Sequence, residues 1–423
     1  MKSRASFVNC NRKNGWRDGV LGDSWFSPAA TGGDHFMERH DFDIPLTFRH
    51  RVIFTRGAFD AGNLALGEIL AEGGGRKALV FVEKSVAEAW EALSEEISEY
   101  FSGLDVALAG VRVFEGGEAC KADDSLVKAV WEEIDTCHID RHSYVLVIGG
   151  GAFLDAVGFA TSTAHRGVRL VRFPTTTLSQ DDSGVGVKSA INAFGKKNWV
   201  GSFGVPFAVI NDFRFLESQD TESSRAGLIE AVKVALVKDR GFFEWIEENA
   251  EALANMERVP FEECVKRSAL LHARHIALGG DAFEAGSSRP LDFGHWAAHK
   301  LEALTDYELS HAEAVAIGLA LDTIYSRKTG LLAEAEAARI LKVLRVMGMA
   351  THHPEMDAVD ENGERKVLAG IDEFREHLGG RLTVLMLAGI GEGVDVHEFD
   401  KPLLDESIAE LMSLGELSMK TVG

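Results

Sequence analysis

The first half of the chain alternates short apolar runs with amphipathic segments of helical period. The apolar runs predict strands at residues 51–55, 78–82, 144–148, 168–173 and 207–211. The segments between them predict helices at residues 64–71, 86–98, 125–137 and 154–165. Strands that alternate with helices are typical of βαβ units on a parallel sheet. We therefore expect a Rossmann-like α/β domain over residues 45–221, after an N-terminal extension of residues 1–44.

The second half of the chain has a mostly helical pattern. Its apolar spacing predicts helices at residues 225–239, 241–256, 261–277, 293–304, 312–329 and 332–347. A glycine-bounded apolar run at residues 380–387 predicts a short late strand or another buried segment. We expect a second, mostly helical domain over residues 222–423, with an active site in the cleft between the two domains.

The charge and cysteine content narrow the range of partners. A formal net charge of −22 argues against nucleic acid or an anionic membrane surface as the main partner, because both would repel the protein. No stretch is long and apolar enough to span a bilayer, and the basic N-terminus lacks the apolar core of a secretory signal. The four cysteines show no CxxC pairing, which is typical of a reducing compartment. We expect a cytoplasmic protein that binds a small molecule.

A glycine turn follows the strand predicted at residues 144–148. Gly149, Gly150 and Gly151 would let the backbone approach a pyrophosphate, whose charge the following helix N-terminus would meet. The pattern is not GxGxxG, so a plain tight turn remains an alternative. Glu83, at an earlier strand end, offers a carboxylate to ribose hydroxyls, and Thr175-Thr176 offer hydroxyls at another strand end.

Two histidines four residues apart indicate a metal site on one helix face. His295 and His299 have this spacing, and His311 precedes another helical segment. Glu230 stands in an apolar helical turn with Lys233 after it, and a buried carboxylate needs a cation. Two histidines and a carboxylate would leave one zinc position open for substrate. A histidine pair in solvent or satisfied in the core is the alternative.

Lysines and glycines cluster between residues 181 and 198 in an otherwise acidic chain. Lys188 and Asn198 in this segment can wrap a phosphate, and Asp182 can accept a hydroxyl proton. Arg166 adds a second basic point after the predicted dinucleotide helix. We expect a flexible phosphate-binding loop, with a solvated charged hairpin as the alternative.

Taken in order, these segments resemble the 3-dehydroquinate synthase superfamily of sugar-phosphate cyclases. The family pattern of GGG, Asp, RG, PTT, DSSxGGK, GKN, AE(V/I)xK, NFGHxxGHxxE and HGEAVAIGM recurs here. It reads GGGAFLD, HRG, PTTT, DDSGVGVK, GKKN, IEAVK, DFGHWAAHKLE and HAEAVAIGL. The resemblance runs from about Arg51 to the C-terminal end. It implies NAD and zinc, or cobalt in its place, in a reaction that eliminates phosphate from a seven-carbon sugar phosphate and closes a carbocycle.

The resemblance also implies roles for individual residues. It assigns the metal to Glu230, His295 and His311, which moves His299 to the phosphate side with Lys188 and Asn198. It assigns Asp182 and Lys233 to the reacting hydroxyls, and it implies that Arg166 reaches a neighbouring subunit's site in a homodimer. The residues at its NAD-site positions are Glu83, Glu118, Lys121, Gly150, Gly151, Asp155, Thr175, Thr176 and Ser218.

Several positions depart from the family pattern, and those that matter most lie where the family binds the far end of the substrate. Asp292 replaces the family asparagine, Arg274 aligns with a family lysine, and an expected arginine has become Ser288 or moved to Arg289. Arg375 lies in a late segment similar to that of the 2-epi-5-epi-valiolone synthases, which use sedoheptulose 7-phosphate. Two further hypotheses remain: a polyol dehydrogenase of the glycerol dehydrogenase type, and a non-catalytic NAD-binding protein.

Overall fold

The computed structural model describes residues 38–194, 196–279, 292–377 and 382–422. The chain divides into two units, residues 1–47 and residues 48–423. In the first unit, residues 38–47 are described and contain no helix or strand. All elements discussed below belong to the second unit.

A six-stranded parallel sheet forms the first half of the second unit, with strand order β1-β8-β5-β4-β2-β3. The strands are β1 (Val52–Thr55), β2 (Lys77–Glu83), β3 (Ala107–Phe114), β4 (Tyr144–Gly149), β5 (Arg169–Pro174) and β8 (Ala208–Asp212). This confirms the predicted α/β class and every strand expected in this half. β3 was missed: it is an edge strand that pairs only with β2, and its side chains are largely half-exposed.

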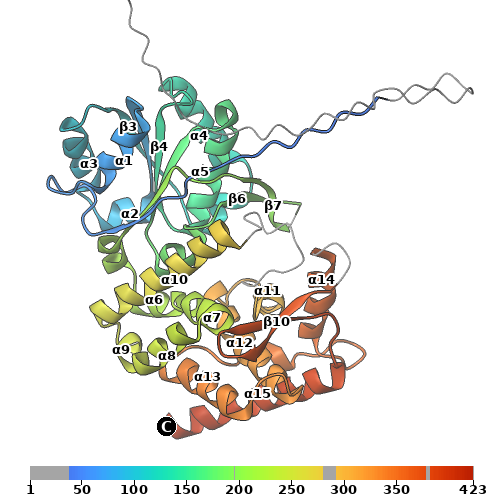
Figure 1. Cartoon of the computed structure of the whole chain (residues 1–423). Helices are drawn as coiled ribbons and strands as arrows, with labels where there is room; N and C mark the ends of the chain where they lie inside the picture. Colours follow the sequence, from blue (N-terminus) through green and yellow to red (C-terminus); the bar gives the residue numbers. More distant parts are fainter. Residues whose placement is uncertain (1–37, 195, 280–291, 378–381, 423) are drawn as a thin grey trace, which may run out of the picture. The chain divides into compact units, whose positions relative to one another are not determined.

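Helices cover both faces of this sheet (Figure 1). Val80 and Val82 of β2 pack in one core with α1 (Ala65–Gly73) and α3 (Leu93–Ser102). Leu79 and Phe81 of the same strand pack in the opposite core with α4 (Ser125–Thr136) and α5 (Gly151–Thr163). Successive side chains of a strand point to opposite faces, so a sheet covered on both sides needs a continuous apolar run. The sequence of β2, KALVFVE, has that form.

The segment predicted as a flexible loop forms ordered structure instead. A π-helical turn at Ser179–Ser183 (η3) leads into an antiparallel hairpin of β6 (Lys188–Ala193) and β7 (Lys196–Phe203). Arg172 of β5 is fully buried beneath it. The guanidinium donates to the carbonyl oxygens of Gly186 at 2.9 Å and Lys188 at 3.0 Å. These hydrogen bonds fix the backbone that enters β6.

The second half is mostly helical, as predicted, around one large apolar core. Its helices are α6 (Thr221–Gly227), α7 (Ile229–Lys238), α8 (Arg240–Glu248), α9 (Ala250–Ala254), α10 (Arg258–Leu278), α11 (His295–Leu304), α12 (His311–Lys328), α13 (Glu334–Val346), α14 (Ala369–His377) and α15 (Lys401–Val422). The predicted late strand appears as β9 (Val384–Gly389), paired with β10 (Glu392–Val396), which was not expected. Helices α14 and α15 were also missed.

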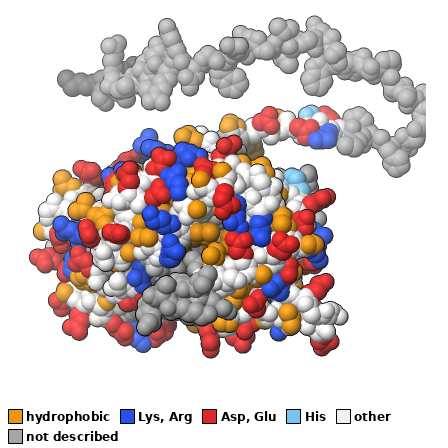
Figure 2. All heavy atoms as spheres, turned by 90° about the horizontal axis from the view of Figure 1, so that it is seen from below, with side chains coloured by type: hydrophobic (Ala, Val, Ile, Leu, Met, Phe, Trp, Pro, Cys, Tyr) orange, Lys and Arg blue, Asp and Glu red, His pale blue; other side chains and the backbone are white. Residues whose placement is uncertain are grey.

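The surface of the second unit mixes charges of both signs. On the face seen in Figure 2, acidic and basic side chains are interspersed with apolar ones. None of the described helices is both long and apolar enough to cross a membrane. The division between domains at residue 221 remains a prediction, although the large sheet ends before it and the long helices follow it.

Candidate active site

The glycine turn lies where β4 meets α5, above the carboxylate of Glu83. Glu83 ends β2 and accepts hydrogen bonds from the backbone N–H of Gly150 at 2.6 Å and of Gly117 at 2.9 Å. A Cβ added at Gly149 would lie 2.7 Å from the Phe153 ring and 2.8 Å from the Glu83 carboxylate. Glycine is therefore needed there for close approach, and Glu83 holds the turn as well as facing the pocket beside it.

That pocket brings most of the predicted NAD-site residues together. It has a volume of about 330 Å³ and lies at the carboxyl ends of the parallel strands, where α/β proteins bind nucleotides. Its predicted residues are Glu83, Gly150, Gly151, Thr175, Thr176 and Ser218. The N-terminus of α5 opens into it, so backbone N–H groups and the helix dipole can meet an anion.

The other predicted NAD-site residues connect this region to the β6–β7 hairpin. Lys121 is buried, and its Nζ donates to Asp155 Oδ2 at 2.8 Å and also to Asn198 Oδ1. Glu118 Oε1 accepts a hydrogen bond from Asn192 Nδ2 at 3.2 Å. The hairpin is thus held against the short helix η1 (Glu118–Lys121) by polar contacts.

Three potential metal ligands converge from three helices of the second half. Glu230, His295 and His311 each offer a donor atom, and these atoms lie within 4.8 Å of one another. Glu230 comes from α7, whose residues are nearly all buried, and Lys233 forms an ion pair with its carboxylate. His295 begins α11 and His311 begins α12. The cluster therefore depends on tertiary packing and not on a local motif.

The protonation state of His295 suits metal binding. His295 Nδ1 contacts the Phe293 carbonyl oxygen at 3.1 Å, which makes Nδ1 the donor and leaves Nε2 toward Glu230. Burial and the charge of Lys233 lower the pKa of His295 well below its ordinary value, so the ring is neutral, as a metal ligand must be. Glu302 accepts from His311 Nδ1 at 3.1 Å in the same way.

The turn before His295 is fixed by a buried carboxylate of α12. Asp322 accepts from the Gly294 backbone N–H at 3.0 Å and from Trp296 Nε1–H at 2.9 Å. Gly294 has a φ of +80°, and a Cβ added at Gly318 would lie 2.0 Å from its carbonyl oxygen. Glycine at both positions lets α12 approach the turn that carries His295.

A single cavity of about 470 Å³ extends from His295, one of the three potential metal ligands, to the β6–β7 hairpin. Residues predicted from the sequence to bind substrate or to act in catalysis line it: Asp182, Lys188, Asn198, Lys233 and Asp292, together with the ligand His295. Asp155 lines it as well. The structure thus brings residues from η3, the hairpin, α7 and the start of α11 to one space.

His272 of α10 also lines this cavity, and sequence reasoning missed it. Its Nδ1 lies 2.9 Å from Asp182 Oδ1. Burial alone would raise the pKa of Asp182, but the charges of His272 and Lys233 hold it below its ordinary value. The signal was present, because Val265, Ser268, Ala269, His272 and Ile276 form the buried stripe of α10 at helical spacing. Arg274, which the family resemblance favoured, is exposed and does not line the cavity.

The remaining predicted residues lie elsewhere. Arg166 is exposed at the end of the helix η2 (Ala164–Arg166), outside the two pockets described. Arg375 pairs with Asp372 on α14 and lines neither pocket. Arg289 lies outside the described residues. His299 is exposed, but its ring centroid lies 5.6 Å from that of His295 and 5.9 Å from that of His311.

Comparison with known proteins identifies the family of the chain. Residues 111–226 match the model of the 3-dehydroquinate synthase N-terminal region, and residues 227–364 match that of its C-terminal region. A 2-epi-5-epi-valiolone synthase from Streptomyces hygroscopicus subsp. jinggangensis, solved with NAD+ and Zn2+ bound, is 27% identical. Its TM-score is 0.77, over 88% of this chain and 99% of that one. A 2-deoxy-scyllo-inosose synthase complexed with carbaglucose-6-phosphate, NAD+ and Co2+ is 22% identical, with a TM-score of 0.70 over 85% and 96% of the two chains.

The fold is that of the sugar-phosphate cyclases. The 3-dehydroquinate synthase of Paracoccus denitrificans is 33% identical over 349 residues, which are 81% of this chain and 92% of that protein. The chain belongs to the 3-dehydroquinate synthase family.

Proposed function

We propose that this protein is a sugar-phosphate cyclase, which eliminates phosphate from a seven-carbon sugar phosphate and closes a carbocycle. The observation that carries the proposal is the shared cavity. Lys188 and Asn198, which suit a phosphate, line the same space as His295, Lys233 and Asp182, which suit a metal and proton transfer. A phosphate and a reacting hydroxyl of one small molecule would fit together in it.

Two cofactors fit the residues present. Glu230, His295 and His311 form the donor set of a catalytic zinc site with one position open, and Co2+ would suit the same donors. Glu83, the glycine turn and the α5 N-terminus suit the ribose and pyrophosphate of NAD. When bound, NAD+ supplies a reversible hydride acceptor and the metal supplies a Lewis acid that lowers the pKa of a substrate hydroxyl.

The protein's own groups would move protons and hold charge. The charges of His272 and Lys233 keep Asp182 ionised, so Asp182 can accept a hydroxyl proton. Lys233 keeps its charge: burial opposes it, but Glu230 and Asp182 raise the pKa of Lys233 above its ordinary value. Lys188 and Asn198, with the predicted contributions of His299 and Arg166, would stabilise the departing phosphate.

One observation favours a second substrate over the keto acid phosphate of 3-dehydroquinate synthases. Asp292 lines the cavity, and the lysines and arginines among the described lining residues are only Lys188 and Lys233. A substrate carboxylate would meet the Asp292 side chain, which repels it when ionised, whereas the hydroxyl groups of a ketose phosphate could donate to it. Sedoheptulose 7-phosphate, the substrate of 2-epi-5-epi-valiolone synthases, is therefore the second candidate.

Two other functions account for fewer of these residues. A polyol dehydrogenase would use the same NAD and metal sites. Its substrate has no phosphate, so it would not need the phosphate-binding residues Lys188 and Asn198 in the cavity. A non-catalytic NAD-binding protein would have no need for the ligand cluster.

We further propose a homodimer in the cytoplasm. The hairpin exposes Phe194, Trp199 and Phe203, which a second subunit could cover, and Arg166 is exposed as a residue reaching a neighbouring site should be. The described cysteines are free, as in a reducing compartment. Light scattering should give twice the mass of the chain.

The substrate is tested by offering each seven-carbon phosphate separately with NAD+ and Zn2+. Inorganic phosphate released from either one supports the cyclase, and the faster substrate identifies its type. Asp292→Asn should raise kcat/KM for the keto acid phosphate relative to sedoheptulose 7-phosphate. Release from neither substrate, with NADH accumulating from an unphosphorylated polyol, would favour the dehydrogenase.

A further inference from the structure

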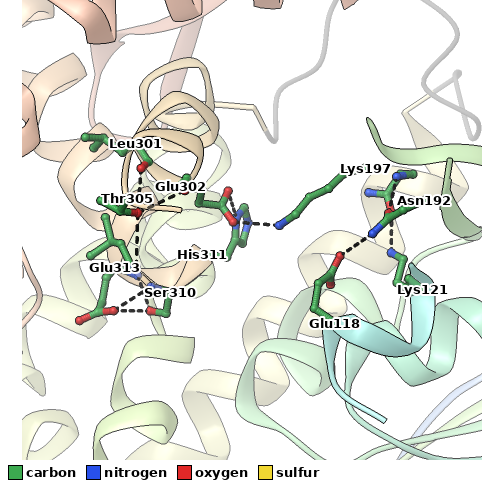
Figure 3. A network of polar contacts seen from close by, with 12 residues as sticks. Glu118, Lys121, Asn192, Lys197, Leu301, Glu302, Thr305, Ser310, His311 and Glu313 are labelled. Atoms are coloured by element: carbon green, nitrogen blue, oxygen red, sulfur yellow. Dashed lines mark hydrogen bonds and ion pairs between the residues drawn. The ribbon is translucent and has the colours of Figure 1, made fainter. Parts of the chain in front are cut away.

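Glu302 is a buried carboxylate between the metal cluster and the hairpin. It lies on α11 seven residues after His295 and three after His299, so all three residues occupy one face of the helix. Glu302 is 4% exposed. Its Oε2 lies 3.1 Å from His311 Nδ1, and its Oε1 lies 3.1 Å from Lys197 Nζ (Figure 3).

This arrangement fixes the tautomer and the orientation of His311. A carboxylate oxygen at this distance accepts the Nδ1–H of His311, which leaves Nε2 as the ring nitrogen that can bind a metal. Ser310 and Glu313 form a capping box that fixes the start of α12, where His311 lies.

Lys197 brings the other charge from a distant part of the chain. It belongs to β7, beside Asn198, which lines the cavity and contacts the buried Lys121. Its ammonium group also lies 4.9 Å from the centroid of the Tyr307 ring, in the segment between α11 and α12. The hairpin, which carries the predicted phosphate-binding residues, is thus joined to the potential metal ligand His311 through the carboxylate of Glu302.

We propose that Glu302 is a positioning residue that holds His311 in the orientation for metal binding, and that Lys197 couples the seating of the β6–β7 hairpin to metal affinity. The inference rests on the proposed function only for the assignment of His311 as a metal ligand. It adds a carboxylate behind that ligand and a link to the phosphate side of the cavity. Coupling of this kind is reciprocal, so a seated hairpin strengthens metal binding and bound metal strengthens hairpin seating.

The test measures the affinity of the full chain for Zn2+ by competition with a chromophoric chelator, without substrate. Glu302→Gln keeps the shape of the side chain but removes its charge, and should weaken Zn2+ binding about tenfold to a hundredfold. Lys197→Met should weaken it by a smaller factor, and the double variant should bind as Glu302→Gln does, because the lysine acts through the carboxylate. Lys196→Met on the same hairpin and Glu308→Gln after α11 are the matched controls, and both should bind as the wild type does.

Two further readouts separate positioning from other roles. The visible spectrum of the Co2+-loaded protein should change in Glu302→Gln, whereas a purely structural residue would leave the ligand field unaltered. Glu302, His299 and His311 also form a second set of potential ligands within 4.8 Å of one another. If Glu302 bound the ion directly in that set, His299→Ala would weaken Zn2+ binding as much as Glu302→Gln; the proposal predicts a loss of only a few fold.

Wild-type affinity and an unchanged Co2+ spectrum in Glu302→Gln would overturn the positioning role. Effects of the Lys197 and Glu302 substitutions that multiply in the double variant would overturn the coupling, since the two residues would then act independently. These failures differ from a failure of the proposed function. If the wild-type chain binds no Zn2+, the assignment of the metal ligands is wrong. If it binds Zn2+ but releases no phosphate from substrate, the proposed cyclase function is wrong and the positioning role of Glu302 still stands.

Discussion

Asp322 offers a quantitative test of how the turn that carries His295 is held. The side chain is fully buried, and burial raises its pKa from 3.8 to about 7, although the hydrogen bonds from Trp296 and Gly294 favour the ionised form. Between pH 3.8 and about pH 7, the folded protein therefore keeps the Asp322 proton, which the unfolded chain has released. Stability should fall as the pH rises through this window, and the loss should be complete above about pH 7. The rise in the pKa of Asp322 from 3.8 to about 7 corresponds to a loss of about 4 kcal/mol in the free energy of unfolding.

Asp322→Asn removes this dependence and replaces it with a fixed cost. The asparagine oxygen can accept from Gly294 N–H or from Trp296 Nε1–H, but its amide group cannot accept from the other donor. One buried donor left without a partner costs about 1–3 kcal/mol. The variant should be less stable than the wild type by that amount at about pH 4. At about pH 8, where the wild type carries the cost of about 4 kcal/mol, the variant should be more stable by about 1–3 kcal/mol.

The assay is urea unfolding of the metal-free wild type and variant, followed by far-ultraviolet circular dichroism at several pH values. The difference in free energy of unfolding between the two proteins cancels the other titrating groups. It should change sign between about pH 4 and pH 8. A difference that stays constant across this range would refute the reasoning, because it would mean that Asp322 is ionised in the folded protein and that its two hydrogen bonds outweigh burial.

Four further substitutions test the site. His311→Ala should lose bound Zn2+ and turnover together; full activity of that variant in a metal-free preparation would rule out the ligand assignment. His272→Ala should lower kcat about a hundredfold or more. It should also move the acid limb of the pH–rate profile upward, because the pKa of Asp182 rises when its partner is removed. Arg274→Ala should change kcat little. A larger loss of kcat in Arg274→Ala than in His272→Ala would restore Arg274 as the substrate-binding residue that the family resemblance favoured. Glu83→Gln leaves one glycine N–H of the turn without an acceptor and should weaken NAD+ binding about tenfold to a hundredfold, measured by fluorescence titration; unchanged affinity would show that the turn needs no anchor.

Local patterns were enough to predict much of the fold. The strands of the sheet that are buried on both faces, such as β2 and β4, stand out as continuous apolar runs. The half-exposed edge strand β3 gives no such signal. Helix α15 does have a signal in the sequence, because Leu404, Ile408 and Leu411 follow helical spacing and are buried. The sequence reasoning overlooked this spacing.

The site was less accessible to local reasoning because its residues meet through packing. The spacing of His295 and His299 predicts one helix face, yet the structure groups His295 with Glu230 and His311 from other helices. Only the family resemblance had indicated that set. Glu302 and Lys197 are 105 residues apart, and no pattern in either segment announces their contact. His272 was within reach, because the buried stripe of α10 includes it and excludes Arg274.

The central claim is that the protein uses NAD+ without consuming it while it expels phosphate. The most direct measurement is the number of phosphates released per NAD+ when the sugar phosphate is in excess and NAD+ is limiting. The account predicts many phosphates per NAD+, with the absorbance of NADH returning to its starting level when the substrate is exhausted. Phosphate release that stops at one per NAD+, or NADH that accumulates in step with substrate loss, would contradict it.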